Sequence, residues 1–231
     1  METETKQDIR TTDFTIQIAN DDHLQFAGEI SHLIKIAAEA RGIGISERPP
    51  AYIREKMHKG NAIIATCQGQ LAGFCYSETW THGKYVANSG LIVAPDYRGH
   101  GLGRKIKEAA FNHSRTKYPD AKIFGITTTP AVMKINSDLG YRPVSFTDLT
   151  RDREFWDGCQ SCPNYDILTK NNRENCLCTG MLYDPVEKEK GNNTSAVDTV
   201  AKNGNGNSKK NNLLKKWLRN GNKNLAEEQQ S

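Results

Sequence analysis

The chain has 231 residues, of which 36% are hydrophobic, and its 31 Lys and Arg against 27 Asp and Glu give a net charge of +4. No run of about 18 apolar residues occurs, so the sequence predicts no membrane span. The polar start METETKQDIR lacks the apolar segment of a signal peptide, and we therefore expect a cytoplasmic protein with reduced thiols.

Apolar patterning divides most of the chain into alternating strands and helices. Strands are predicted at residues 12–18, 61–67, 71–78, 84–94 and 121–127, with a further strand beginning at 141–144. A helix capped by Asn20-Asp21-Asp22 is predicted to end at Gly42, and a short helix that follows Pro49-Pro50 is predicted to end at Gly60. Further helices are predicted after the loop, with Leu102, Ile106, Ala109 and Ala110 at helical spacing, and at residues 130–138. We expect an α/β (α+β) domain over residues 1–147, a Cys-rich extension over 148–185 and a tail over 186–231.

The most informative stretch is LIVAPDYRGHGLGR at residues 91–104, where an apolar strand enters a glycine-rich turn that opens a helix. Arg98, Gly101 and Gly103 give the spacing R-x-x-G-x-G, and Gly99 fills one free position. Glycines allow positive φ and close backbone approach, and N–H groups at a helix N-terminus bind anions. The stretch predicts a pyrophosphate-binding loop, although an isolated match of this kind also fits an ordinary strand-to-helix turn.

Two other nucleotide-binding motifs are excluded by spacing. A P-loop needs Lys-Ser or Lys-Thr after its glycines, and neither follows here. A dinucleotide fingerprint needs a third glycine and an acidic residue at the end of the next strand, but that strand ends in Ile126-Thr127-Thr128.

The loop and the order of elements over residues 12–147 resemble the GNAT superfamily of acyl-CoA-dependent N-acyltransferases. The resemblance implies a GNAT fold, which is a mixed central sheet with a splayed strand pair flanked by helices. It also implies acetyl-CoA or another acyl-CoA as co-substrate, and direct attack by a primary amine without a covalent acyl-enzyme. The cofactor-binding residues that it implies are Ile92, Val93, Arg98, Gly99, His100, Gly101, Leu102, Gly103 and Arg104.

Residues 124–144, FGITTTPAVMKINSDLGYRPV, resemble the N-acetylglutamate synthases more narrowly. This resemblance implies a small amino acid such as glutamate as acceptor, and a role in amino-acid biosynthesis. Many other GNAT enzymes carry a tyrosine four residues before the glycine of this last turn, where it is thought to protonate the leaving CoA thiolate. Asn136 stands there instead. An amide cannot supply a proton, so the general acid is unassigned.

An amine attacks a thioester only as the neutral base, so the site needs a group that takes a proton from the ammonium. Glu78 is the candidate, acting through water, with His82 nearby; the alternative is a strand end in solvent followed by an ordinary turn. A glutamate acceptor also needs cationic partners. Arg41 and Arg48 lie in the segment that shapes the acceptor pocket in this family, although ordinary surface positions would equally account for them.

Four of the six cysteines form a C-x₂-C pair followed by a C-x-C pair, at Cys159, Cys162, Cys176 and Cys178. Four thiolates on two short loops can enclose a tetrahedral ion, which predicts a structural zinc site. The second spacing departs from the usual two intervening residues, and disulfides or unpaired structural thiols are the alternatives.

Residues 186–231 are rich in Asn, Lys and Gly, which predicts disorder. Nine basic and five acidic residues there account for the whole net charge, so the remaining chain offers no basic surplus for nucleic acid. Residues 213–219 form a short basic amphipathic patch, which we interpret as a solvated helical turn.

Three classes of function fit these observations. The first is acyl transfer to a small-molecule amine, and the second is acyl transfer to a protein or peptide amine. The third is a non-catalytic acyl-CoA-binding protein, because Asn136 and the uncertain base leave the catalytic groups unassigned.

Overall fold

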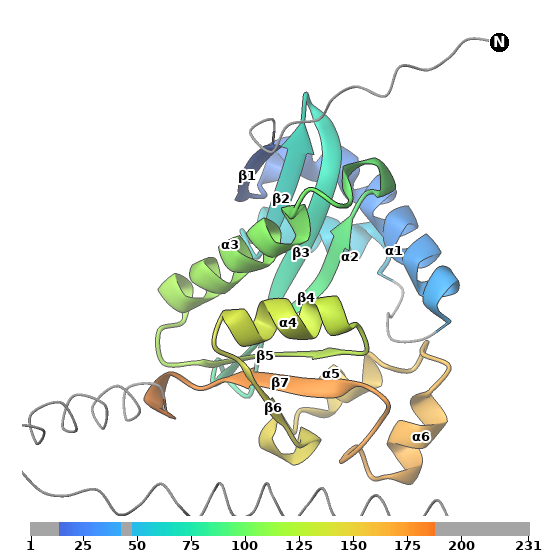
Figure 1. Cartoon of the computed structure of the whole chain (residues 1–231), viewed down its shortest axis with the longest axis vertical. Helices are drawn as coiled ribbons and strands as arrows, with labels where there is room; N and C mark the ends of the chain where they lie inside the picture. Colours follow the sequence, from blue (N-terminus) through green and yellow to red (C-terminus); the bar gives the residue numbers. More distant parts are fainter. Residues whose placement is uncertain (1–13, 43–47, 188–231) are drawn as a thin grey trace, which may run out of the picture. The chain divides into compact units, whose positions relative to one another are not determined.

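The computed structural model describes residues 14–42 and 48–187, which all lie in the first of the chain's two units, residues 1–188. The N-terminal ten residues and the patch at 213–219 lie outside the described residues. The strands are β1 (Phe14–Ile18), β2 (Ala62–Cys67), β3 (Gln70–Trp80), β4 (Tyr85–Val93), β5 (Lys122–Thr127), β6 (Arg142–Val144) and β7 (Thr179–Tyr183) (Figure 1). The α-helices are α1 (Ala27–Arg41), α2 (Pro50–His58), α3 (Leu102–Lys117), α4 (Pro130–Asp138), α5 (Arg153–Asp157) and α6 (Tyr165–Lys170).

The strands form one mixed sheet in the order β1-β2-β3-β4-β5-β7-β6. Neighbouring strands run antiparallel except for β4 and β5, which are parallel. The predicted α/β fold with a mixed, helix-flanked sheet is therefore confirmed. Across residues 14–42 and 48–187, every helix is too short or too polar to cross a membrane.

Alternating side chains of β2 fix the layers on the two faces of the sheet. Ala62 and Ile64 belong to a core cluster with residues of α1 and α2. Ile63 and Ala65 point the other way, into a cluster with residues of α3. Successive residues of a strand face opposite sides of a sheet, so one buried strand holds helices on both faces.

The C-terminal part of the described chain is built into the same sheet. β7 lies between β5 and β6, with Phe124 opposite Leu182 on one side and Arg142 opposite Leu182 on the other. Phe146, Trp156 and Leu182 share a core cluster with Phe124. The end of the predicted extension, residues 148–185, therefore completes the central sheet.

Strand β4 carries a bulge that only glycine accommodates. The register between β3 and β4 shifts between Phe74 and Tyr76, opposite Gly90. Gly90 has a φ of +65°, and a Cβ at this position would lie 2.5 Å from the Tyr76 ring. A bulge bends its strand and increases the local twist. The bulge lies in the part of β4 that leads to the glycine-rich loop.

Replacing Gly90 by alanine should lower the free energy of unfolding by about 2–4 kcal/mol, because a positive φ and a contact with Tyr76 are both unfavourable. Gly83→Ala is the matched control, since Gly83 has a φ of +82° and a Cβ there would meet nothing within 4 Å. The control should lose only about 1 kcal/mol. Urea unfolding of both variants measures the difference; equal losses would contradict the role of the Tyr76 contact.

Candidate active site

The sheet parts between β4 and β5. Their backbone pairing ends with Ala87 opposite Phe124, after which β4 stays with β3 and β5 stays with β7. A cavity of about 320 Å³ lies at this parting, lined by both strands, by α2 and by parts of residues 154–178. Diverging strand edges present backbone N–H and C=O groups, which suits this cavity to binding a polar, extended ligand.

The glycine-rich loop leaves β4 and ends at the N-terminus of α3. Gly99 and Gly101 have φ values of +86° and +71°, and a Cβ at either position would meet nothing within 4 Å. Gly101 is the N-cap residue of α3. The first backbone N–H groups of this helix and the positive end of its dipole therefore meet at an open surface, which favours an anion.

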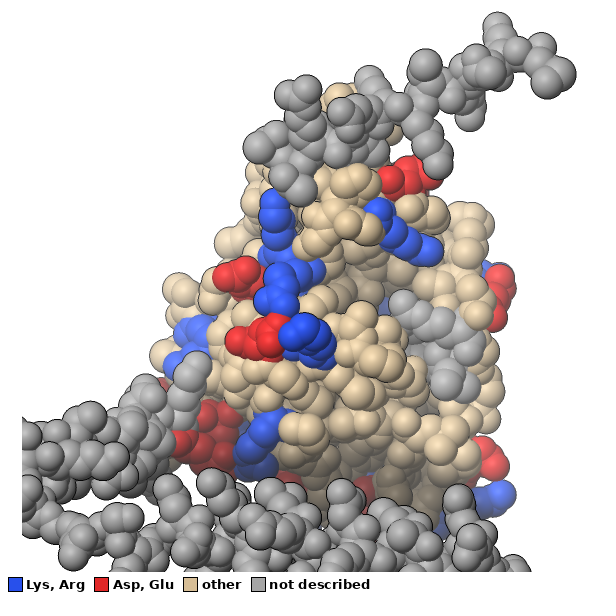
Figure 2. Space-filling view, in the orientation of Figure 1, with Lys and Arg blue, Asp and Glu red and all other residues tan. Residues whose placement is uncertain are grey.

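The side chains of this loop have different roles. Arg98 is exposed and donates through Nε to the Val93 carbonyl oxygen at 3.1 Å, while Leu102 is buried, so Leu102 presents only its backbone. Arg104 forms an ion pair with Asp138 of α4. Figure 2 shows basic side chains with acidic ones beside them over α3 and α4. The second predicted loop arginine is thus already paired with a carboxylate.

The two strand residues predicted to contact the cofactor lie beyond the parting. Ile92 pairs with Phe74 and Val93 pairs with Gly73, both in β3. Ile92 is buried and lines the cavity. The strand that carries both residues has no pairing with β5 at this level, which is consistent with the predicted splayed pair.

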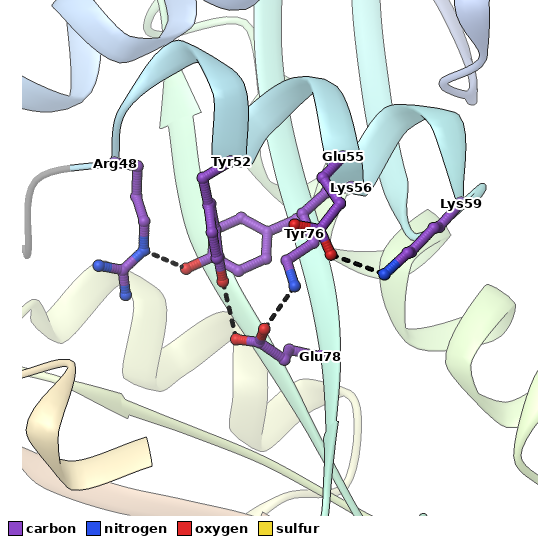
Figure 3. A network of polar contacts seen from close by, with 7 residues as sticks. All are labelled: Arg48, Tyr52, Glu55, Lys56, Lys59, Tyr76 and Glu78. Atoms are coloured by element: carbon purple, nitrogen blue, oxygen red, sulfur yellow. Dashed lines mark hydrogen bonds and ion pairs between the residues drawn. The ribbon is translucent and has the colours of Figure 1, made fainter. Parts of the chain in front are cut away.

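Glu78 lies on the cavity wall and is held by two residues of α2 (Figure 3). Tyr52 donates its hydroxyl to Oε2 of Glu78 at 2.7 Å, and Lys56 donates to Oε1. The Glu78 side chain is 24% exposed and that of Lys56 is 8% exposed. Since β3 continues to Trp80, Glu78 is not a strand end, whereas His82 is exposed in the following turn.

Arg48 precedes α2 in the chain and lines the same wall of the cavity. Its Nε donates to the Tyr76 hydroxyl at 2.7 Å, and its guanidinium lies 5.4 Å from the centre of the Tyr52 ring. Burial raises the pKa of both phenols, so they stay protonated as hydrogen-bond donors. The side chain of Arg41, the other predicted cation, lies outside the described residues.

A buried polar cluster fills the base of the parting. The Asn88 amide donates to Ser114 Oγ at 2.8 Å and to Ser77 Oγ at 3.0 Å, and its oxygen accepts from the Tyr141 hydroxyl at 3.1 Å. Lys107 of α3 is 2% exposed and lines the cavity. The sequence reading missed Lys107, although it stands beside Ile106 on the apolar face of a predicted helix, where a lysine is out of place.

The four late cysteines lie along the cavity, and the zinc site that their spacing predicts stays a prediction. Among residues 14–42 and 48–187, no group of three or more His, Cys, Asp or Glu side chains is arranged to hold a metal ion. Burial, with a smaller contribution from neighbouring thiols, raises the pKa of Cys159 to about 11 and of Cys178 to about 12. The electrostatic effects that these thiols exert on one another show that Cys159, Cys162, Cys176 and Cys178 lie near one another.

Comparison with solved structures finds the same fold in acetyltransferases. N-acetylglutamate synthase from Neisseria gonorrhoeae, complexed with coenzyme A and N-acetyl-glutamate, is 17% identical with a TM-score of 0.54; the match covers 74% of this chain but 35% of the synthase. Rv2747 from Mycobacterium tuberculosis, in complex with CoA, is 16% identical with a TM-score of 0.54, covering 74% of this chain and 98% of that one. YncA, an acetyltransferase from Salmonella typhimurium with acetyl-CoA, is 15% identical with a TM-score of 0.52, covering 74% and 94% of the two chains.

These matches show that the parted sheet and the glycine-rich loop before α3 belong to a fold that is shared with these proteins. The family model "Acetyltransferase (GNAT) family" matches residues 30–131, which span the cavity-lining strands and the loop. Residues 30–131 therefore match a GNAT acetyltransferase domain, and the resemblance drawn from the sequence is confirmed. No curated protein matches the sequence.

The raised pKa values predict slow alkylation of two cysteines. With pKa values of about 11 and about 12, Cys159 and Cys178 hold little thiolate at pH 8, so iodoacetamide should label them on the order of 100-fold more slowly than glutathione. The rates should rise about tenfold per pH unit between pH 8 and 10. Peptide mass spectrometry of the native protein measures this; labelling of both at the glutathione rate would contradict their burial.

Proposed function

We propose that the protein transfers an acetyl or other short acyl group from acyl-CoA to the primary amine of a small amino acid such as glutamate. The observation that carries the proposal is the cavity at the parting of β4 and β5, where Glu78 and Arg48 share a wall with the edge of β4. Glu78 can bind an ammonium group and Arg48 can bind a carboxylate. Together, beside the proposed thioester site, they match a substrate that carries both charges.

The donor end of the proposal rests on the loop. The pyrophosphate of CoA would lie on the N-terminus of α3 at Gly99, Gly101 and Gly103, with Arg98 beside it and Leu102 contributing its backbone N–H. The pantetheine would follow the free edge of β4 past Val93 and Ile92 into the cavity. The three structurally similar proteins were solved with CoA or acetyl-CoA, which supports this choice of donor.

The acceptor end rests on Glu78 and Arg48. Tyr52 and Lys56 hold the Glu78 carboxylate in one orientation, so it keeps a fixed place on the wall. The guanidinium of Arg48, with five N–H donors, can receive a carboxylate while Nε stays on Tyr76. The complex of the Neisseria gonorrhoeae synthase with N-acetyl-glutamate supports an amino acid as the acceptor.

These groups define a direct transfer. Glu78 takes a proton from the acceptor ammonium through a water molecule, which leaves the neutral amine that attacks the thioester carbon. Backbone N–H groups near Ile92 and Val93 would stabilise the oxyanion that forms. When the amine and the thioester are bound in one cavity, they are held in a reactive orientation and no longer need to meet by collision in solution.

A thiol-release assay tests the proposal. Acetyl-CoA and succinyl-CoA are offered with amino acids, with amines that lack the α-carboxylate, with polyamines and with peptides. Turnover should be highest with an amino acid and at least tenfold lower with its decarboxylated amine, because only the former engages Arg48. Turnover confined to peptides would assign a protein acceptor, and CoA binding without turnover would assign a non-catalytic role.

Glu78→Gln should lower kcat/KM by about 100-fold or more, because the amide keeps the hydrogen bond with Tyr52 but cannot take a proton. Glu55→Gln is the matched control: Glu55 lies on the same helix as Lys56 and pairs with exposed Lys59 at 2.7 Å (Figure 3). A kcat/KM of Glu78→Gln within threefold of wild type would remove Glu78 from the mechanism.

A further inference from the structure

The amine of Lys107 lies at the base of the parting between β4 and β5. Its Nζ donates to the Asn88 carbonyl oxygen at 3.2 Å, and it would lie 4.0 Å from a Cβ placed on Gly125. Asn88 and Gly125 each follow directly the last paired residues of their strands, Ala87 and Phe124. The side chain thus runs from α3 to the point where the two strands separate.

Within the described part of the chain, the Lys107 amine has no acidic neighbour. The groups that face it are the Cys75 thiol from β3 and the Tyr141 ring, whose centre is 5.4 Å from Nζ, while β4 and β5 contribute uncharged Asn88 and Gly125. Burial raises the pKa of both the thiol and the phenol, so both are neutral at neutral pH. Among the described residues, no carboxylate forms an ion pair with Lys107 or contributes to the electrostatics of its amine.

A buried lysine without a counter-charge holds its proton weakly. Desolvation lowers the pKa of Lys107 below that of an ordinary lysine. Such a group gives up a proton readily, and a developing anion beside it would favour its charged form. The feature costs stability, which a purely structural position would avoid by carrying leucine or methionine.

Asn136 of α4 lines the same cavity and leaves a polar atom unused. It is 1% exposed, and its Oδ1 has no hydrogen-bond partner among the described residues. A buried carbonyl oxygen of this kind calls for an N–H or S–H donor from a ligand. The amide itself has no proton to give to a thiolate, so another group must supply it.

We propose that Lys107 is the proton donor to the CoA sulfur, a role that rests on the transferase function proposed above. The amine of the acceptor forms the new C–N bond, and the C–S bond breaks with its electron pair on sulfur. The Lys107 ammonium transfers one proton to that thiolate, which leaves CoA as the thiol and Lys107 as the neutral amine. The acceptor nitrogen loses its second proton to water, because Glu78 already holds the first, and Lys107 regains a proton from water after product release.

Lys107→Met and Lys107→Arg test this role in the full chain. Methionine keeps the volume but removes the proton, and arginine keeps the charge but does not release a proton at working pH. Both variants should lose about 100-fold or more in kcat while binding CoA within threefold of wild type. The fall in wild-type kcat at alkaline pH, as Lys107 deprotonates, should be absent in both. Lys117→Met, at the exposed far end of α3, is the control.

A second measurement does not depend on turnover. The thiol of CoA bound to wild type should ionise at lower pH than free CoA, because the ammonium stabilises the thiolate; thiolate absorbance during a pH titration reports this. Lys107→Met should abolish that shift. It should also melt at a higher temperature than wild type, with the gap closing as pH rises, because only the unfolded chain keeps this lysine charged in that range.

The outcomes separate the two proposals. Failure of wild type to acylate any amine would overturn the transferase function, while a Lys107-dependent shift of the bound thiol would still support the lysine. A Lys107→Met enzyme with kcat within threefold of wild type and an unchanged thiol titration would overturn the role of Lys107. A variant that melts lower and binds CoA poorly would mark Lys107 as structural, and would likewise overturn it.

Discussion

The parting of two parallel strands is the constraint on which the rest of this structure depends. Once pairing stops after Ala87 and Phe124, backbone groups on both edges need other partners, and side chains from α3, α4 and α2 converge on the gap. A sheet that stayed paired would be simpler to stabilise. The same gap, however, gives an extended ligand its hydrogen-bonding edge, and it lies directly behind the loop that ends at α3.

The gap is kept open by features that each cost stability. Gly90 takes a positive φ over the Tyr76 ring, and that ring in turn receives the Arg48 side chain. At the base, Asn88 satisfies its own amide through two serines and a tyrosine, and presents its carbonyl oxygen to Lys107. A buried polar network whose members are all hydrogen-bonded holds each group in a fixed position, which suits a site where position matters.

Features formed by residues close together in the chain could be predicted from the sequence, whereas contacts between distant residues could not. The loop at 98–103 is contiguous, and its glycines and following helix are local features, so the anion site and most elements were readable from the pattern. The pairing of Glu78 with Tyr52 and Lys56 joins residues from β3 and α2, and no spacing along the chain encodes it. The four cysteines show what spacing can predict, since two pairs separated in the chain lie near one another along the cavity. The sequence does contain one indication of Lys107, because it is a cation on the apolar face of a predicted helix. Hydrophobic periodicity alone assigns no role to such a residue.

The position of β7 has a consequence for how the protein is made. Because β7 is inserted between β5 and β6, this central strand is translated after both of the strands that it joins. Until Tyr183 has emerged, β5 and β6 each have an open edge, and Phe124 lacks the cover of Leu182. Open strand edges invite pairing with other chains. The nascent chain thus passes through a stage in which β5 and β6 are translated but the sheet between them is unfinished.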